Sequence, residues 1–214
     1  MKKVVLFMAI SMLFMNFLHA GHPTSRVFPL SKTKFVVNEK GADGEKVIDL
    51  TGQDLIVASL REEGADGIAY AIDRDGVVWW AAPISSGAKG HETPSGVFPI
   101  FRKERFYMSK SHPDAQGINN MDFSLWFTPQ GHAIHMGNDD GMSHGCIHVG
   151  SKGAATMFKW AKKGTRVVVT REHYLPFVYY DLLQSGYKES KVKKAHIKEY
   201  LKRMKPIQPN MQAQ

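Results

Sequence analysis

The 214-residue sequence contains a single cysteine, Cys146. Disulfide bonds within the chain are therefore excluded, and with them the class of small disulfide-rich secreted modules. Long apolar runs are almost absent as well. The one that stands out, Val4 to Leu18, is shorter than the about 20 residues of a transmembrane helix, which excludes a multi-span membrane protein. Aromatic residues make up 11% of the chain and charged residues 22%, a composition that excludes a wholly disordered protein.

The N-terminal residues have the composition of an export signal. Lys2 and Lys3 give a positive start, Val4 to Leu18 form an apolar segment, and Ala20 is a small residue at its end. Residues 1–20 therefore predict a signal peptide that is cleaved after Ala20. Leu18 is the third residue before this cleavage site and is larger than the residue preferred there, so an uncleaved N-terminal anchor is the alternative interpretation. In both cases we expect an exported protein of the periplasm or cell wall.

Positive charge is concentrated near the C-terminus. Residues 188–205 hold seven lysines and one arginine against two glutamates, a net charge of +6. Lys2 and Lys3 supply the rest of the formal +8, which leaves residues 21–185 neutral. A neutral body argues against a nucleic-acid partner. The basic segment can face an anionic wall polymer or membrane surface, or it can be the solvated side of a helix. We favour the helix, because apolar residues recur at helical spacing in Ile197, Tyr200, Leu201 and Met204.

Apolar alternation and turn signals predict a mainly β fold with one or two helices. Two hairpins are expected around the turns at 73–76 and 129–131. A helix is expected over 154–163, ended by Gly164. The expected strands are 47–50, 54–57, 68–72, 77–82, 97–101, 124–127, 132–135 and 166–170. The predicted organisation is a signal peptide at 1–20, a lead-in at 21–44, a β domain at 45–172 and a basic helical extension at 173–214.

Histidines gather around the single cysteine. Four of the ten histidines lie with Cys146 between residues 131 and 149, and they are His132, His135, His144 and His148. Because side chains alternate along a strand, Cys146 and His148 share a face, and only one of His132 and His135 is expected to join them. A neighbouring imidazole activates a thiol, and Gly145 lets a substrate carbonyl approach backbone amides. The pattern predicts a nucleophilic cysteine site.

A structural role and a zinc site are two other interpretations of this cluster. Histidines on strands are often structural, but their grouping around one cysteine of an exported chain argues against that. Histidine and cysteine are also zinc ligands, yet the chain has no paired cysteines, and the spacing matches no common zinc motif. We therefore expect neither a metal nor a cofactor.

Four short motifs follow one another along the chain. They are S-S-G and H-E-T-P-S-G-V-F within Ser85–Phe98, A-I-H-M-G at Ala133–Gly137, S-H-G-C-I at Ser143–Ile147, and G-T-R-V-V-V at Gly164–Val169. Together they resemble the signature of the YkuD-type L,D-transpeptidase family. The resemblance extends over residues 47–170 and implies a mixed β-sandwich catalytic domain.

The resemblance also implies a cysteine enzyme that acts on the stem peptides of peptidoglycan. In that family's pattern, Cys146 is the nucleophile and His135 the general base, while His144 flanks the site. Ser143 supports a histidine ring through its backbone, and Gly145 with Cys146 supplies oxyanion amides. The remaining candidates are expected to bind substrate, and they are His148, Met136, Gly137 and Trp126.

The reaction implied by the resemblance begins with a thioester at the L-centre of the third stem residue, usually a diaminopimelate, and releases the terminal D-alanine. An amine acceptor then gives a crosslink, and water as acceptor gives an L,D-carboxypeptidase. A wall-binding or metal-binding module without turnover is a further alternative. His148 departs from the arginine or asparagine common in the family. Since a histidine ordinarily titrates near pH 6.5, its charge is expected to make substrate binding depend on pH.

Overall fold

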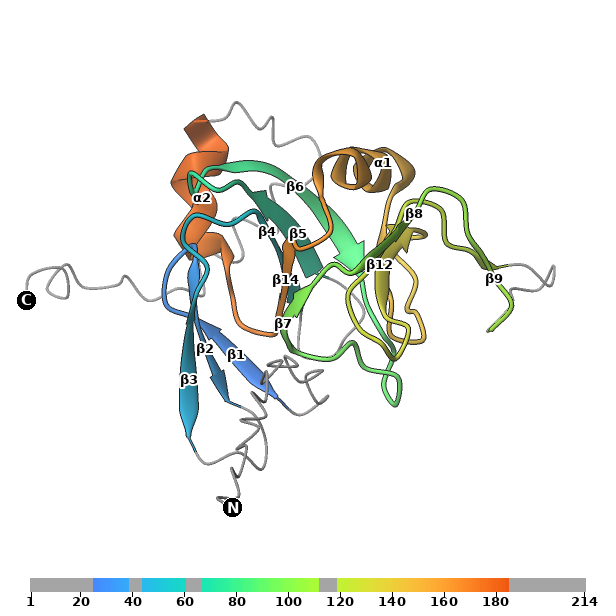
Figure 1. Cartoon of the computed structure of the whole chain (residues 1–214), viewed down its shortest axis with the longest axis horizontal. Helices are drawn as coiled ribbons and strands as arrows, with labels where there is room; N and C mark the ends of the chain where they lie inside the picture. The colour runs from blue at the N-terminus through green and yellow to red at the C-terminus, as the bar shows by residue number, and fades with distance from the viewer. Residues whose placement is uncertain (1–24, 39–43, 61–66, 112–118, 185–214) are drawn as a thin grey trace, which may run out of the picture.

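The structure, a computed structural model, describes residues 25–38, 44–60, 67–111 and 119–184 (Figure 1). Within these ranges the chain forms a nine-stranded sheet, a three-stranded sheet, a two-stranded ribbon and two helices. The elements are β1 (Arg26–Pro29), β2 (Lys34–Asn38), β3 (Glu45–Asp49), β4 (Leu55–Leu60), β5 (Gly67–Ile72), β6 (Val78–Ser85), β7 (Gly96–Pro99), β8 (Arg102–Glu104), β9 (Met108–Ser109), β10 (Asn119–Asn120), β11 (Ser124–Trp126), β12 (Ala133–Met136), β13 (Ile147–Val149), α1 (Ser151–Trp160), β14 (Arg166–Thr170) and α2 (Leu175–Gln184).

The nine-stranded sheet has the order β7-β14-β4-β5-β6-β13-β12-β11-β8. It is mixed, because β4 pairs with β14 and β12 pairs with β13 in parallel, while the other neighbours are antiparallel. The two expected hairpins are confirmed as β5–β6 and β11–β12, and the expected helix is confirmed as α1. The mainly β fold with two helices is therefore as predicted.

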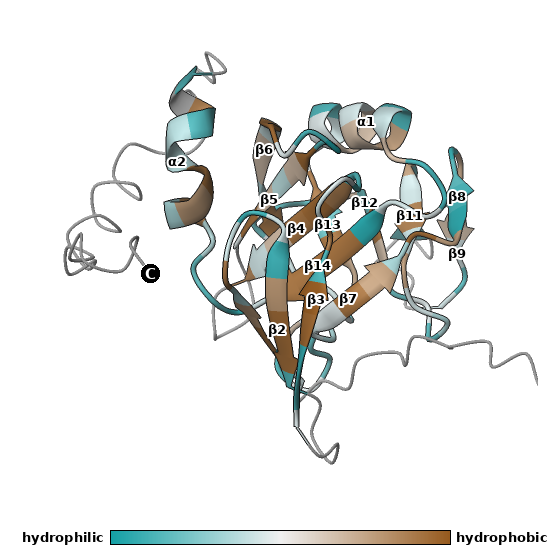
Figure 2. Cartoon of the chain, turned by 60° about the vertical axis from the view of Figure 1, so that its left-hand side comes forward, coloured by the Kyte–Doolittle hydropathy of each residue, from teal (hydrophilic) through white to brown (hydrophobic). Residues whose placement is uncertain are grey.

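Both faces of this sheet are buried against apolar layers. In β4, Ile56 and Ala58 contact the cluster under α1, whereas Leu55 and Val57 contact the cluster under the three-stranded sheet and α2. This is the period-two alternation of a strand that is covered on both sides. Figure 2 shows the result as brown central strands with hydrophilic residues toward the periphery.

The three-stranded sheet was not expected. The strands expected at 47–50 and 54–57 correspond to β3 and β4, but β3 pairs with β2 in a separate sheet. The lead-in also contains strands β1 and β2. Their apolar residues alternate, and Phe35 and Val37 are buried in the core, which the polar composition around them concealed.

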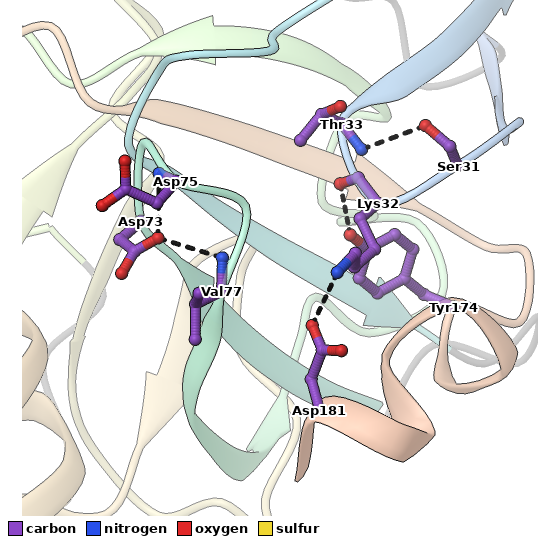
Figure 3. Close-up of polar contacts among 8 residues, drawn as sticks. All are labelled: Ser31, Lys32, Thr33, Asp73, Asp75, Val77, Tyr174 and Asp181. Atoms are coloured by element: carbon purple, nitrogen blue, oxygen red, sulfur yellow. Dashed lines mark hydrogen bonds and ion pairs between the residues drawn. The ribbon is translucent and has the colours of Figure 1, made fainter. Parts of the chain in front are cut away.

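The three-stranded sheet is joined to α2 by polar contacts (Figure 3). Lys32 forms a 2.8 Å ion pair with Asp181, and the hydroxyl of Tyr174 donates a hydrogen bond to the Lys32 carbonyl. The ring of Tyr174 also stacks on Phe35. Of the C-terminal extension expected at 173–214, the structure describes residues 173–184, which include α2. The predicted signal peptide at 1–20 and the basic segment at 188–205 lie outside the described residues.

Candidate active site

Strands β12 and β13 carry the predicted site residues. They run parallel, with His135 opposite His148. Ile147 and Val149 point into the core on one face, so Cys146 and His148 share the other face. Cys146 and His148 therefore share a face as the alternation predicted, and the histidine that joins them on this face is His135, the one that the family resemblance implied.

The thiol of Cys146 lies over the beginning of β12. The side chain is half-buried and contacts an apolar cluster that contains Trp126 and Ala133. Its Sγ lies 3.8 Å from the carbonyl oxygen of Gly131. Burial raises the pKa of the Cys146 thiol, and a hydrogen bond from the backbone of Ala133 opposes this only in part. At neutral pH the resting thiol is therefore protonated.

The ring of His135 is almost completely buried, with 2% of its surface exposed. Its Nδ1 lies 2.7 Å from the carbonyl oxygen of Met136, which can only accept a hydrogen bond, so Nδ1 carries the proton and Nε2 is free to act as a base. Burial, followed by the charge of His148, lowers the pKa of His135 to about 4, against the opposing effect of the Met136 carbonyl. A neutral imidazole thus accompanies a neutral thiol.

His148 lies between His135 and the loop that follows β12. Its ring centroid is 4.8 Å from that of His135, and its Nδ1 donates to the carbonyl oxygen of Asn138 at 3.2 Å. The ring also lies against Gly137, where a Cβ would come within 2.7 Å of it, so only glycine fits there. Burial lowers the pKa of His148. Hydrogen bonds to the backbone of Asn138 and Gly141 act in the opposite direction, but they offset the effect of burial only in part. The ordinary histidine pKa assumed from sequence is therefore not retained.

The loop before Cys146 is held by its own serine. The hydroxyl of Ser143 donates to the Cys146 carbonyl at 2.6 Å and accepts from the Gly145 N–H at 3.0 Å. The backbone of Ser143 is bonded to the segment after β6: its N–H donates to Ser86, and its carbonyl accepts from Ala88. These bonds fix the backbone of Gly145 and Cys146 beside the thiol. They also engage the Gly145 N–H, which the sequence had suggested as an oxyanion donor, with the Ser143 hydroxyl.

Gly145 has a positive φ of 112° and lies against the ring of His132. A Cβ at this position would come within 2.7 Å of that ring, which explains the glycine. His132 is itself oriented by a 2.6 Å hydrogen bond between its Nδ1 and the Thr128 hydroxyl. His132 thus contacts the loop before the nucleophile and the core residue Phe127, whereas His135 lies on the sheet face of His148.

Thr93 was not among the residues expected to matter. Its buried hydroxyl accepts a hydrogen bond from the Gly87 N–H at 3.0 Å and donates to the Gly145 carbonyl at 2.9 Å. The Thr93 carbonyl accepts in turn from Nη2 of Arg171 at 2.9 Å. Thr93 belongs to the T-P-S-G motif, and this motif could have indicated its importance. Arg171 follows the last strand and belongs to no motif, so nothing in the sequence indicates its contact.

The other candidates are not all on this face, because the side chain of Met136 packs against the core cluster of Ile134 and Val149 on the opposite face. Trp126 is 7% exposed and forms part of the floor of the Cys146 face. His144 is exposed, with its ring centroid 4.7 Å from that of His91. Across the described ranges no three histidine, cysteine or acidic side chains are arranged to hold a metal ion. The described helices are also too short or too polar to cross a membrane.

The family model of the YkuD L,D-transpeptidase catalytic domain matches residues 55–169, more than half of the chain. The chain belongs to this family. The match begins with β4 and ends one residue before the end of β14, so it includes the nine-stranded sheet except Thr170 and omits the three-stranded sheet and α2. No curated protein matches the chain significantly.

Solved L,D-transpeptidases are among the structures similar to this domain. One from Mycobacterium smegmatis is 20% identical, with a TM-score of 0.46 and coverage of 65% of this chain and 68% of the other. L,D-transpeptidase 1 of Mycobacterium tuberculosis is 21% identical, with a TM-score of 0.44 and coverage of 66% and 73%. An Enterococcus faecium enzyme is 22% identical, with a TM-score of 0.46 and coverage of 58% and 55%.

Proposed function

We propose that this L,D-transpeptidase family member transfers acyl groups of peptidoglycan stem peptides through a thioester on Cys146. The observation that carries the proposal is the shared sheet face of Cys146 and His135, beside the backbone that Ser143 holds in place, within the residues that match the family. A nucleophile, a base and oxyanion donors are the three parts that acyl transfer needs.

The first half-reaction releases D-alanine. His135 Nε2 removes the thiol proton as Sγ attacks the carbonyl carbon at the L-centre of the third stem residue. The N–H of Cys146 stabilises the oxyanion, because the N–H of Gly145 is already donated to the Ser143 hydroxyl. The C–N bond to the terminal D-alanine then breaks, and the imidazolium returns the proton to the leaving amine. A thioester and a neutral His135 remain.

The second half-reaction transfers the acyl group. An amine of a neighbouring stem peptide attacks the thioester carbonyl, His135 takes a proton from that amine, and the departing Sγ recovers it. Water in place of the amine gives the L,D-carboxypeptidase, which uses the same residues. The choice depends on how well the acceptor excludes water from the thioester.

The substrate places the proposed site of action outside the cytoplasmic membrane, in agreement with the export signal expected at 1–20. We also propose that the basic segment 188–205 attracts anionic wall or lipid surfaces, an effect that acts within a Debye length of about 8 Å at physiological salt. Removal of 188–205 is expected to weaken sedimentation with sacculi, most at low salt, while activity on a small soluble muropeptide persists. Unchanged sedimentation contradicts this role.

The function is tested by product analysis. Purified protein is incubated with a disaccharide-tetrapeptide muropeptide, and free D-alanine, crosslinked dimer and tripeptide are measured by mass spectrometry. Dimer with D-alanine identifies the transpeptidase, and tripeptide with D-alanine identifies the carboxypeptidase. The matched control is Cys146→Ala, which is expected to give neither. D-alanine release by that variant contradicts the proposal.

A further inference from the structure

The sheet face of Cys146 continues outward to the edge strand β8. Ala133 lies opposite Trp126, and Trp126 lies opposite Arg102. Cys146 contacts the same cluster as Trp126 and Ala133. Since residues that lie opposite one another point to the same face, one row of side chains leads from Cys146 through Ala133 and Trp126 to Arg102.

A second row runs beside the first. His135 lies two residues beyond Ala133, and Ser124 lies two residues before Trp126 on the antiparallel partner, so both point to this face. Ser124 lies opposite Glu104. The row that contains Cys146 therefore ends at Arg102, a cation. The row that contains His135 ends at Glu104, an anion.

Arg102 is held in a defined orientation. Its Cζ lies 5.1 Å from the ring centroid of Trp126 and 5.3 Å from that of Tyr107, which are cation–π distances. Its Nε donates to Oε1 of Glu104 at 3.0 Å. In the described part of the chain, Nη1 and Nη2 have no hydrogen-bond partner. The pair is solvent-accessible, with side chains 45% and 38% exposed, and such pairs contribute little to folding stability.

We propose that Arg102 and Glu104 form a subsite for a zwitterionic amino-acid group, that is, a carboxylate and an ammonium on one carbon. The proposal rests on the proposed function, because a diaminopimelate at the third stem position ends its side chain in such a group. The Nη atoms of Arg102 bind the carboxylate, for which the planar guanidinium is suited. Oε2 of Glu104 binds the ammonium.

The distances fit this substrate. Three strand spacings of about 4.8 Å separate the backbones of Cys146 and Arg102, about 14 Å in all. In diaminopimelate, six C–C bonds of about 1.5 Å join the two carboxyl carbons, a span of about 7–8 Å when extended. The Arg102 side chain covers the rest, since it lies over Trp126 and thus toward β12.

Specificity for the third residue follows from this subsite. A lysine there has an ammonium but no carboxylate, and a diaminopimelate amidated at its distal carboxylate has lost the negative charge. Both are expected to bind more weakly, roughly tenfold to a hundredfold, since one charged hydrogen-bonded contact is lost.

The test uses three tetrapeptides with diaminopimelate, amidated diaminopimelate or lysine at position three. Their dissociation constants are measured by calorimetry on the full-length Cys146→Ala protein, and KM and kcat for D-alanine release on the protein with Cys146 intact. Arg102→Gln is expected to raise the KM of the diaminopimelate peptide, so that the preference for this peptide is lost. The kcat on the amidated peptide is expected to remain unchanged. Arg102→Lys is expected to restore part of the preference. The matched control is Arg105→Gln, because Arg105 also stacks on a ring, that of Phe123, but does not belong to the row.

The outcomes separate the subsite from the function. Equal binding of the three peptides, or an equal loss on all of them in Arg102→Gln, overturns the subsite. A preference that persists in Arg102→Gln overturns it too. Preferential binding of the diaminopimelate peptide that Arg102→Gln abolishes supports the subsite, even if no peptide releases D-alanine, a result that contradicts the proposed function instead.

Discussion

The rings of His135 and His148 lie edge to face on neighbouring parallel strands, with centroids 4.8 Å apart. The two imidazoles therefore repel each other when both are protonated, and this adds to the burial that lowers the pKa of His135 to about 4. The proposed base is consequently neutral and able to accept a proton throughout the neutral range.

His148→Asn is expected to raise the pKa of His135, because it removes the neighbouring charge while burial remains. The pKa is measured by NMR titration of the His135 ring in a Cys146→Ala background. The acid limb of kcat/KM in the otherwise unchanged enzyme is expected to move to higher pH with it. An unchanged His135 pKa shows that burial alone accounts for the shift.

Alkylation of the single cysteine reports its protonation state. Because burial raises the pKa of Cys146 and the thiolate is the reactive form, the iodoacetamide rate is expected to climb steadily with pH to above pH 8.5. The rate is followed by intact mass from pH 5 to pH 10. His135→Ala serves as the control and is expected to have nearly the same profile. A plateau between pH 5 and pH 7 reveals a thiolate–imidazolium pair and contradicts the neutral resting state.

Thr93 is expected to act as a positioning residue through its hydrogen bond to the Gly145 carbonyl. Thr93→Val keeps the shape but removes the hydroxyl, so kcat is expected to fall with KM little changed, because the Gly145–Cys146 peptide, which carries the oxyanion N–H of Cys146, loses its alignment. Thr93→Ser retains the hydroxyl and is expected to rescue most of kcat. If Ser and Val variants lose activity equally at equal thermal stability, the hydroxyl has no such role.

His132 and His135 are expected to respond differently to substitution. His135→Ala removes the base, and the rate is expected to fall by roughly 10²–10⁴. His132→Ala removes a ring that supports Gly145, and a smaller fall is expected. Turnover of both variants is compared at matched thermal stability. The opposite ranking assigns the proton transfer to His132.

Local patterns predicted the parts of the fold that depend on neighbours in sequence. The 73–76 and 129–131 turns identified their hairpins, and the alternation around Cys146 placed His148 on the nucleophile's face. The pairing of β3 with β2, by contrast, depends on burial of Phe35 beneath a sheet formed by distant segments.

The candidate site shows the same limit. Motifs identified Cys146 and His135, but the Thr93–Gly145 bond joins residues 52 positions apart, and no sequence spacing indicates it. Likewise, the lowered pKa of His148 comes from burial in the assembled fold, which the residue type alone does not reveal.

The central claim is that Cys146 forms a thioester with a stem peptide. Its most direct test is the intact mass of the protein after rapid acid quench with a diaminopimelate tetrapeptide. The account predicts a mass increase equal to the peptide minus D-alanine, localised to Cys146 and discharged by an amine acceptor or by water. D-alanine release without any adduct at the earliest times, or an adduct on another residue, contradicts it.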